Sequence, residues 1–307
     1  MQKISKITLG TAQLGLKYGV ANKIGKPDFN SSINILKHAW SQAINTFDTA
    51  PVYGNSEEII GTFIKSLVKD EIENIVIISK LPKIEIKDKI SFDLLYTHIK
   101  KQVYQSISNL NLKSIPIYLL HHADDIYLKD GIVIECLKHL KEEGLIKKIG
   151  ISIYDPEEVE DSLNFKEIEA IQVPINLFDH RFIKTGLLKK LEKRKIIIFA
   201  RSIYLQGLFF KSLNDLPQNL KIAEKPLKKL NEIVKNFKID IVELAALFVR
   251  DIPEISSMII GAETIDQVKN NIEILQKIPL KKEIREIILE DFAEIPKKLI
   301  DPRLWKI

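Results

Sequence analysis

The sequence predicts a closed (β/α)8 barrel, and three observations support this fold class. Eight short β-branched runs alternate with longer amphipathic runs along 307 residues, a length that is usual for such a barrel. Some of the short runs, such as Ile75–Ile78 and Ile196–Phe199, are apolar at consecutive positions, as in parallel strands that are covered on both faces. An open doubly wound sheet is the alternative, but it would require a G-x-G-x-x-G motif after an early strand, and the sequence has none.

The expected elements follow one another as strand and then helix, a pattern that favours a closed barrel over an open sheet. Strands are expected at Ile7–Thr11, Thr46–Asp48, Ile75–Lys80, Ile117–His121, Ile149–Ser152, Ala170–Pro174, Ile196–Arg201 and Ser257–Ile260. Helices are expected at Ser31–Gln42, Ser56–Lys69, Asp93–Leu110, Ile132–Glu143, Pro156–Phe165, Ile183–Arg194, Pro226–Asn236, Ile241–Arg250 and Thr264–Leu275. No Pro/Gly/Ser-rich linker divides the chain, so residues 1–307 are expected to form one domain. The tail Lys281–Ile307 is expected to pack across the barrel, anchored by Leu299, Leu304 and Trp305.

Composition argues against several classes of protein. The formal net charge is +5, but lysines and acidic residues are interspersed, so we expect no nucleic-acid partner. No stretch approaches 18 apolar residues, so no membrane span is expected, and the charged segment Met1–Leu9 does not resemble a signal peptide. The single cysteine, Cys136, lies among apolar residues at helical spacing and is expected to be buried in a helix rather than to act as a nucleophile. These features predict a cytoplasmic protein.

Polar residues stop several of the apolar runs, at the end of the barrel where active sites are built. Tyr53 follows Asp48 by five residues, in the loop after the second strand. The polar residues at the strand ends are Asp48, Lys80, His121 with His122, Ser152, Gln172, and Arg201 with Ser202.

Four of these residues suggest a chemistry. A free tyrosine has a pKa of about 10, and a nearby ammonium group such as that of Lys80 stabilises the phenolate and lowers that pKa. Asp48 can hold the lysine charged and in position, and His121 can orient a carbonyl group. Tyr53 can then donate a proton to a carbonyl oxygen while a hydride arrives at the carbon, and that hydride must come from a nicotinamide or a flavin. Each residue alone is more often structural, but four of them at the ends of three consecutive strands are a much rarer coincidence.

The motifs around these residues resemble those of the aldo-keto reductase family, in order from about residue 7 to residue 275. The most specific is Asp48-Thr49-Ala50-Pro51-Val52-Tyr53-Gly54-Asn55-Ser56-Glu57, which resembles the family's D-T-A-x-x-Y-G-N-S-E signature. The weaker, collinear matches are Leu9-Gly10-Thr11, Ile77-Ile78-Ser79-Lys80, Leu119-Leu120-His121, Gly150-Ile151-Ser152, Ile171-Gln172, Ser202 with Gly207-Leu208, Ile260-Gly261-Ala262, and Gln267 to Asn271.

The resemblance implies a role for each matching residue. Tyr53 would be the general acid, Lys80 and Asp48 would tune it, and His121 would orient the carbonyl. Asp48 would also touch the nicotinamide ribose, and Ser152 with Gln172 would hold the carboxamide. The cofactor would be NADP(H), with NAD(H) as the alternative, and the enzyme would be a monomer that acts on a small-molecule carbonyl substrate. The residues implied to bind the cofactor are Gly10, Thr11, Asp48, Ser152, Gln172, Arg201, Ser202, Gly207, Gly261, Ala262, Gln267 and Asn271.

The second histidine of the pair leaves one alternative open. His121 and His122 would point to opposite faces if both lay on the strand, and the family pattern selects His121. A metal site formed by His121, His122 and Asp124 is a weaker alternative, and we expect no metal.

The sequence departs from the family pattern at three places. Ile153 stands where many relatives have Asn, and Arg201 stands where an aromatic residue usually stacks on the nicotinamide. A guanidinium plane can also stack, so we expect Arg201 to take that place. Many relatives carry Lys or Arg for the 2′-phosphate after the eighth strand, whereas this chain has Gly261, Ala262, Glu263 and Gln267 there. We therefore expect only weak discrimination between NADPH and NADH.

The first loop, Gly15 to Pro27, is long for a connection of this kind. It is not a P-loop, because Gly19 and Gly25 are one residue too far apart and Pro27 replaces the required Ser or Thr. The loop is expected to shape substrate choice at the rim of the site. Its lysines, Lys17, Lys23 and Lys26, either meet an anionic substrate or are simply solvated.

Two functions therefore remain after the sequence is read. The first is a carbonyl reductase, with a sugar or sugar derivative as the favoured substrate. The second is a catalytically silent nucleotide-binding redox sensor or regulatory subunit. The complete set of Asp48, Tyr53, Lys80 and His121 favours the enzyme, because a sensor need not retain the acid. A barrel lyase or isomerase would require a metal cluster or a Schiff-base lysine in another setting.

Overall fold

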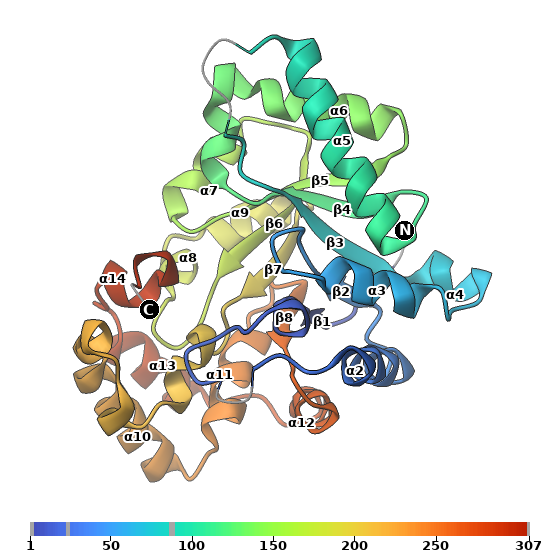
Figure 1. Cartoon of the computed structure of the whole chain (residues 1–307). Helices are drawn as coiled ribbons and strands as arrows, with labels where there is room; N and C mark the ends of the chain where they lie inside the picture. The colour runs from blue at the N-terminus through green and yellow to red at the C-terminus, as the bar shows by residue number, and fades with distance from the viewer. Residues whose placement is uncertain (1–2, 23–24, 86–89, 306–307) are drawn as a thin grey trace.

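The computed structural model describes residues 3–22, 25–85 and 90–305. Its strands form a closed barrel in which each strand pairs in parallel with its neighbours in the chain, and β8 pairs with β1. Figure 1 shows the helices arranged around these strands. The predicted (β/α)8 barrel is therefore confirmed. The strands are β1 (Ile7–Gly10), β2 (Thr46–Asp48), β3 (Val76–Leu81), β4 (Ile115–Leu120), β5 (Ile146–Ser152), β6 (Ile168–Pro174), β7 (Ile197–Arg201) and β8 (Ser257–Gly261).

The helices connect successive strands, and α10 and α11 both lie between β7 and β8. The α-helices are α1 (Ala12–Gly15), α2 (Phe29–Ser41), α3 (Ser56–Ile64), α4 (Lys69–Asn74), α5 (Phe92–Leu110), α6 (Ile132–Glu142), α7 (Pro156–Ser162), α8 (Arg181–Lys184), α9 (Leu187–Lys193), α10 (Glu224–Phe237), α11 (Ile241–Arg250), α12 (Ile265–Leu275), α13 (Lys282–Asp291) and α14 (Lys297–Ile300). Short 3-10 helices are η1 (Ala123–Gly131), η2 (Leu205–Phe210), η3 (Leu213–Asp215), η4 (Gln218–Ala223) and η5 (Pro302–Leu304). Within the described ranges, none of the helices combines the length and apolar character needed to cross a bilayer.

The core has two layers, as the fully apolar strands predicted. Side chains that fill the barrel interior pack against one another, whereas those on the outer face of the strands pack against the helices. The interior set is Val76, Ile78, Ile117, Leu119, Ala170 and Phe199. Cys136 is fully buried on α6, as expected. This packed interior is typical of barrels whose reactive groups are confined to the strand ends and loops.

Most element ends agree with the prediction to within one to three residues, but two predicted helices are each divided in the structure. The run Ser56–Lys69 ends as a helix at Ile64, and α4 begins at Lys69, where the Glu71 carboxylate accepts a hydrogen bond from the Val68 backbone N–H. The run Ile183–Arg194 is broken at Gly186, whose φ of +72° is left-handed and ends the helical geometry. β5 and β6 begin earlier than predicted. Polar residues such as Lys147 interrupt the apolar pattern at the start of these strands, so the sequence does not show their first residues as strand.

The C-terminal segment packs as expected against the loops after β5 and β6, with one correction. Figure 1 shows it beside α8, and Lys297 pairs with Asp155 at 2.7 Å. Leu299 is fully buried and Trp305 is buried, but Leu304 is 46% exposed, so it is not an anchor. It lies on the short turn η5, which leaves its side chain outside, and Ile300 is buried instead. Residues 306 and 307 lie outside the described residues.

Candidate active site

The carboxyl ends of the strands surround one cavity of about 520 Å³, a size that is usual for a small-molecule site. Of the predicted site residues, those that line it are Gly10, Asp48, Tyr53, His121, Ser152, Gln172, Arg201, Ser202, Gly207, Gly261, Gln267 and Asn271. Three predicted residues, Thr11, Lys80 and Ala262, do not line the cavity but are buried directly behind it. The barrel therefore brings together side chains that are more than 200 residues apart in the chain.

Behind the cavity wall lies a buried ion pair. Lys80 Nζ donates to Asp48 Oδ1 at 2.8 Å, to Asp48 Oδ2 at 2.9 Å and to the Thr49 carbonyl oxygen at 2.8 Å. Gln172 Nε2 also donates to Asp48 Oδ1. Lys80 is 1% exposed and Asp48 is 5% exposed. Burial lowers the pKa of Lys80, and the Asp48 carboxylate opposes that shift. Because both groups are removed from water, their charges are stabilised by the hydrogen bonds between them.

Tyr53 lies between this ion pair and His121. Lys80 Nζ is 4.8 Å from the centre of the Tyr53 ring, and the rings of Tyr53 and His121 meet edge to face with centroids 5.8 Å apart. Burial raises the pKa of Tyr53, Asp48 raises it further, and Arg201 opposes both. The net shift of this pKa is therefore upward rather than downward as expected, because burial and the Asp48 carboxylate are its largest causes. Tyr53 holds its proton at neutral pH, as a proton donor must.

His121 is a neutral imidazole. Burial lowers its pKa to about 3, and the positive charge of Lys80 contributes to the shift. Its Nδ1 is buried without a hydrogen-bond partner among the described residues. Neutral histidine has one N–H and one free lone pair, so this side chain can orient a carbonyl oxygen without adding charge.

His121 and His122 do not point to opposite faces, as they would if both lay on the strand. β4 ends at Leu120, so His121 and His122 lie on a bend, and their ring centroids are only 5.3 Å apart. They do not take opposite faces, because the alternation of side chains holds only within a strand. Among the residues that the structure describes, no group of three His, Cys, Asp or Glu side chains is placed to hold a metal ion.

Comparisons with known proteins agree with this geometry. The model of the aldo/keto reductase family matches residues 6–290. The chain belongs to this family. It is 27% identical to the oxidoreductase YqkF of Bacillus subtilis, with 88% of this chain and 87% of the relative covered. It is 25% identical to the NADH-specific methylglyoxal reductase of Escherichia coli, with 89% and 90% covered. The holo form of an aldo-keto reductase from Bacillus halodurans has the same fold, with a TM-score of 0.73 at 22% identity and 97% and 96% covered.

In this family member, the loop that carries Tyr53 is held by close backbone contact. A Cβ atom at Gly15 would lie 1.7 Å from the Tyr53 carbonyl oxygen, and one at Gly54 would lie 2.3 Å from the Gly15 carbonyl oxygen. Only glycine allows such an approach, and Gly54 also has a φ of +60° that favours glycine.

Buried hydroxyl groups fix the start of the same loop. Thr11 Oγ1 donates to the Asp48 carbonyl oxygen at 2.8 Å and shares a hydrogen bond of 2.6 Å with Ser56 Oγ, which also accepts from Thr49 Oγ1 at 2.9 Å. Thr11 therefore acts on the site by positioning the loop, whereas the resemblance implied a direct contact with the cofactor.

Sequence reasoning missed two aromatic residues at the same end of the cavity. The Arg201 guanidinium lies 3.9 Å from the centre of the Tyr154 ring, and the Arg303 guanidinium lies 3.5 Å from it. Tyr18 also lines the cavity, and burial raises its pKa, with Tyr53 adding to the shift. Tyr154 follows the predicted strand end at Ser152 by two residues, and Tyr18 lies in the long first loop. Both positions could therefore have been identified from the sequence as candidates for the rim of the site, but only the fold shows that both lie near Tyr53.

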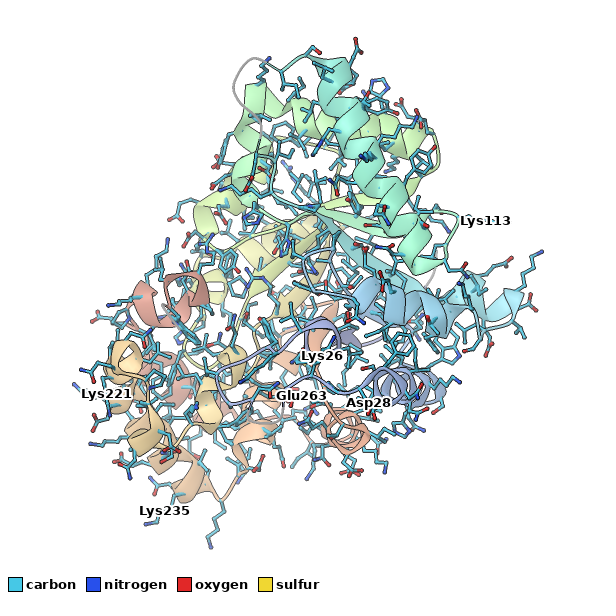
Figure 2. The ribbon with its side chains drawn as sticks, viewed as in Figure 1. Lys26, Asp28, Lys113, Lys221, Lys235 and Glu263 are labelled. Atoms are coloured by element: carbon cyan, nitrogen blue, oxygen red, sulfur yellow. The ribbon has the colours of Figure 1, made fainter. Side chains whose placement is uncertain are left out.

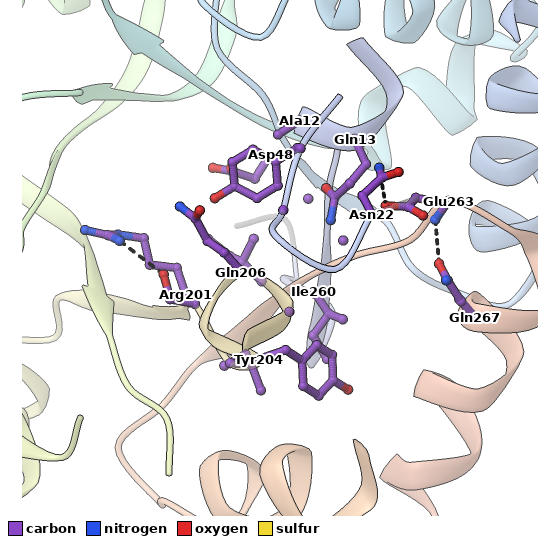
Figure 3. A pocket seen from close by; sticks show the side chains of 18 of the residues that line it. Ala12, Gln13, Asn22, Asp48, Arg201, Tyr204, Gln206, Ile260, Glu263 and Gln267 are labelled. Carbon is purple, nitrogen blue, oxygen red and sulfur yellow. Dashed lines mark hydrogen bonds between the residues drawn. The ribbon is translucent and has the colours of Figure 1, made fainter. Parts of the chain in front are cut away.

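The opposite end of the cavity is closed by the first loop. Asn22 Nδ2 donates to Glu263 Oε1 at 2.9 Å, and the Glu263 backbone N–H donates to Gln267 Oε1 at 2.6 Å. The backbone N–H of Val20 donates to the Gln206 carbonyl oxygen at 2.9 Å. Figure 3 shows Asn22, Glu263 and Gln267 on one side of the cavity and Arg201 on the other. The first loop thus lies across the cavity, as expected of a rim segment.

The two described lysines of this loop, Lys17 and Lys26, do not line the cavity. Lys17 is exposed, and Lys26 Nζ donates to Asn55 Oδ1 at 2.9 Å and to the Gly15 carbonyl oxygen at 3.3 Å. Figure 2 shows Lys26 and Glu263 over the centre of the molecule, whereas Lys113, Lys221 and Lys235 lie toward its edge. Lys23 lies outside the described residues. Tyr18, Gly19, Ala21 and Asn22 are the loop residues that line the cavity instead.

Proposed function

We propose that this protein is an NAD(P)H-dependent carbonyl reductase that acts on an aldehyde or ketone, with a sugar derivative as the favoured class. The observation that carries the proposal is the convergence of Asp48, Tyr53, Lys80 and His121 on one cavity. A nicotinamide, when bound, supplies the hydride that adds to the carbonyl carbon. Tyr53 donates its phenolic proton to the carbonyl oxygen, which becomes the hydroxyl group of the product. Membership of the aldo/keto reductase family supports the same reaction class.

The residues around Tyr53 have separate tasks in this proposal. His121 donates a hydrogen bond to the carbonyl oxygen and so directs it toward Tyr53. The Lys80 ammonium group, held by Asp48, stabilises the negative charge that develops on the tyrosine oxygen as the proton leaves. Because His121 is neutral and Tyr53 is protonated at rest, the site begins in the state that the reduction requires.

The lining of the cavity supports the binding of a dinucleotide. Gly10, Gly207 and Gly261 lie along it, and a Cβ at Gly261 would lie 2.0 Å from Gln13 Nε2, so a glycine keeps this part open. The Ser152 hydroxyl lines the cavity and bonds no other residue in the described part of the chain. Ser152 and Gln172 would hold the carboxamide. The other residues proposed to bind the cofactor are Gly10, Asp48, Arg201, Ser202, Gly207, Gly261, Gln267 and Asn271, and Thr11 and Ala262 would support them from behind the cavity wall.

The cofactor is proposed to be NADP(H), with NAD(H) bound nearly as well. The far end of the cavity has Glu263 and Gln267 but no lysine or arginine among its described lining residues. One relative is named as an NADH-specific reductase, which supports a role for the unphosphorylated nucleotide. The enzyme is proposed to be a monomer that acts on a small-molecule carbonyl substrate.

The alternative is a silent nucleotide-binding sensor or regulatory subunit. One relative at 22% identity is named as a putative voltage-gated potassium channel subunit beta, so the family is not confined to enzymes by name. A sensor would need the cofactor-binding residues but not a protonated Tyr53 facing His121, and this difference makes the two functions separable by experiment.

The decisive experiment is Tyr53→Phe. We expect kcat on a good carbonyl substrate to fall roughly 10²- to 10⁴-fold, because a positioned proton donor is lost. Fluorescence titration with NADPH and NADH should give nearly unchanged dissociation constants. Tyr104→Phe, which removes a hydroxyl from the exposed face of α5, is the matched control and should retain full activity. Wild-type kcat in Tyr53→Phe would contradict the proposed role, and nucleotide binding without reduction of any aldehyde or keto sugar would favour the sensor.

A further inference from the structure

The cavity contains a cation whose charge is not matched by any group described around it. Three lining residues carry a formal charge in the described part of the chain: Asp48, Arg201 and Glu263. Asp48 is paired with Lys80, and Glu263 lies at the opposite end, bonded by Asn22. No carboxylate of the described residues forms a salt bridge with Arg201.

The hydrogen bonds of Arg201 leave much of its guanidinium unused. Nη2 donates to the Ile153 carbonyl oxygen at 2.7 Å, and Nη1 donates weakly to Ser202 Oγ at 3.3 Å. Nε is buried and has no hydrogen-bond partner among the described residues. A guanidinium has five N–H donors, and a buried donor left unpaired is costly unless a ligand satisfies it.

The neighbours of Arg201 hold its plane in place rather than neutralise it. One face stacks on Tyr154, and the opposite face of that ring is occupied by Arg303, which is itself paired with Asp301 at 2.7 Å. The nearby Asp179 carboxylate is bonded by Arg181 Nε at 2.8 Å. The carboxylates of Asp301 and Asp179 therefore each have a cation of their own, and Arg201, which faces the cavity, has no carboxylate partner among the described residues.

We propose that the substrate carries an anionic group, a phosphate or a carboxylate, and that Arg201 binds it beside the reacting carbonyl. This inference rests on the proposed carbonyl reduction and narrows its substrate class. Arginine suits the task because its rigid fork matches both anions with two parallel hydrogen bonds. Arg201 also lies close enough to Tyr53, His121 and Tyr18 for its charge to affect all three, which places the anion at the reactive end of the cavity. The rim lysines considered from the sequence are replaced in this role by a strand-end arginine.

The test compares pairs of aldehydes in which one member carries an anionic group and the other does not. kcat/KM is measured for glyceraldehyde 3-phosphate against glyceraldehyde, and for succinic semialdehyde against butyraldehyde. We expect the wild-type enzyme to prefer the charged member of at least one pair by roughly 10- to 100-fold, the effect of one charge-assisted contact. The pair that shows the preference identifies phosphate or carboxylate as the source of the anion.

Substitutions then assign the preference to Arg201. Arg201→Gln should abolish it, so that the ratio of kcat/KM between the charged and neutral members of each pair falls to about one, and Arg201→Lys should retain part of it. Lys17→Gln removes one charge from the same rim without touching the cavity and should leave the preference unchanged. Equal charged and neutral values in the wild type, or an undiminished preference in Arg201→Gln, would overturn the inference. So would a loss of cofactor affinity in Arg201→Gln that accounts for the whole loss of kcat/KM on the charged substrates, because Arg201 would then serve the nucleotide alone.

A binding measurement separates this inference from the proposed function. Calorimetric titration of the NADP⁺-saturated protein with glycerol 3-phosphate and with 4-hydroxybutyrate requires no turnover. Binding of either anion that is lost in Arg201→Gln but kept in Lys17→Gln would support the anion site even if no aldehyde were reduced. Reduction of neutral aldehydes without Arg201-dependent binding of either anion would support the proposed reductase and contradict the anion site.

Discussion

The two ends of the cavity are built in different ways. At the reactive end, Asp48, Lys80 and Gln172 come from three strands and are bonded to one another in a buried cluster. At the far end, Glu263 and Gln267 come from a loop and a helix start and are more exposed. The Glu263 carboxylate accepts a hydrogen bond from Asn22 of the first loop, and the Glu263 backbone N–H donates to Gln267. A group fixed by strand backbones and buried hydrogen bonds is hard to change without damage, whereas loop residues can be exchanged. The reactive end is therefore rigidly specified, whereas the far end, where we propose that cofactor selectivity is set, is adjustable.

The largest effect should follow from breaking the rigid end with Lys80→Met. This change leaves the Asp48 carboxylate buried without its cation, which typically costs about 3–5 kcal/mol in the free energy of unfolding. It should also raise the pKa of Tyr53, because the unopposed carboxylate disfavours the phenolate. We expect turnover to fall by at least about 10²-fold. Urea unfolding and the pH dependence of kcat measure the two effects.

A double variant makes this prediction specific. Lys80→Met combined with Asp48→Asn removes both charges, so most of the lost stability should return while activity stays low. If the double variant is no more stable than Lys80→Met alone, the loss arises from packing rather than from an unpaired charge. If Lys80→Met has the kcat of the wild type and the same dependence of kcat on pH, Lys80 has a structural role and does not act on Tyr53.

A smaller effect is expected at the adjustable end, in the choice between NADPH and NADH. We expect the dissociation constants to differ by less than a hundredfold, with NADPH favoured, because no described cation lines this part of the cavity. Two lysines that follow β8 in the chain form ion pairs of their own: Lys269 with Asp266 at 3.1 Å and Lys282 with Glu286 at 3.4 Å. Glu263→Arg should shift the preference toward NADPH by roughly tenfold or more, since one charge-assisted hydrogen bond has about that effect.

Fluorescence titrations at low and moderate salt would measure this change, with Lys269→Gln as the control that should alter neither constant. A wild-type preference above a hundredfold would mean that a basic residue reaches the phosphate after all.

The smallest effect concerns the dependence of kcat on pH, in which we expect no inflection from the titration of His121. Because the pKa of His121 is about 3, kcat should show no inflection near pH 6.5 between pH 5 and 8. The same shift makes folding less favourable as pH falls from about 6.5 toward 3, since the unfolded histidine binds a proton that the folded one does not. His121→Gln should reduce this loss of stability, measured by urea unfolding at pH 7 and pH 4.5. A clear inflection near pH 6.5 that disappears in His121→Gln would contradict the neutral imidazole.

The sequence by itself determined the barrel and pointed to the residues that we propose carry its chemistry. Apolar runs such as Ile75–Ile78 have no polar face, so they had to be covered on both sides, and polar residues could stop these runs only at the strand ends. Asp48, Tyr53, Lys80 and His121 were therefore identifiable from local pattern and from a motif that is continuous along the chain. Helix breaks were less visible, because the left-handed geometry at Gly186 is decided by packing around α8 and α9.

Only the tertiary structure decided how the charges are matched. Opposite charges that are distant in sequence meet through barrel closure, so no local pattern shows that Asp48 neutralises Lys80 and leaves Tyr53 fully protonated. For the same reason the sequence pointed to lysines of the first loop as contacts for an anion, whereas the fold turns Lys26 toward Asn55 and leaves Arg201 facing the cavity. The energy of a charge depends on its burial and its partners, and both are properties of the folded chain.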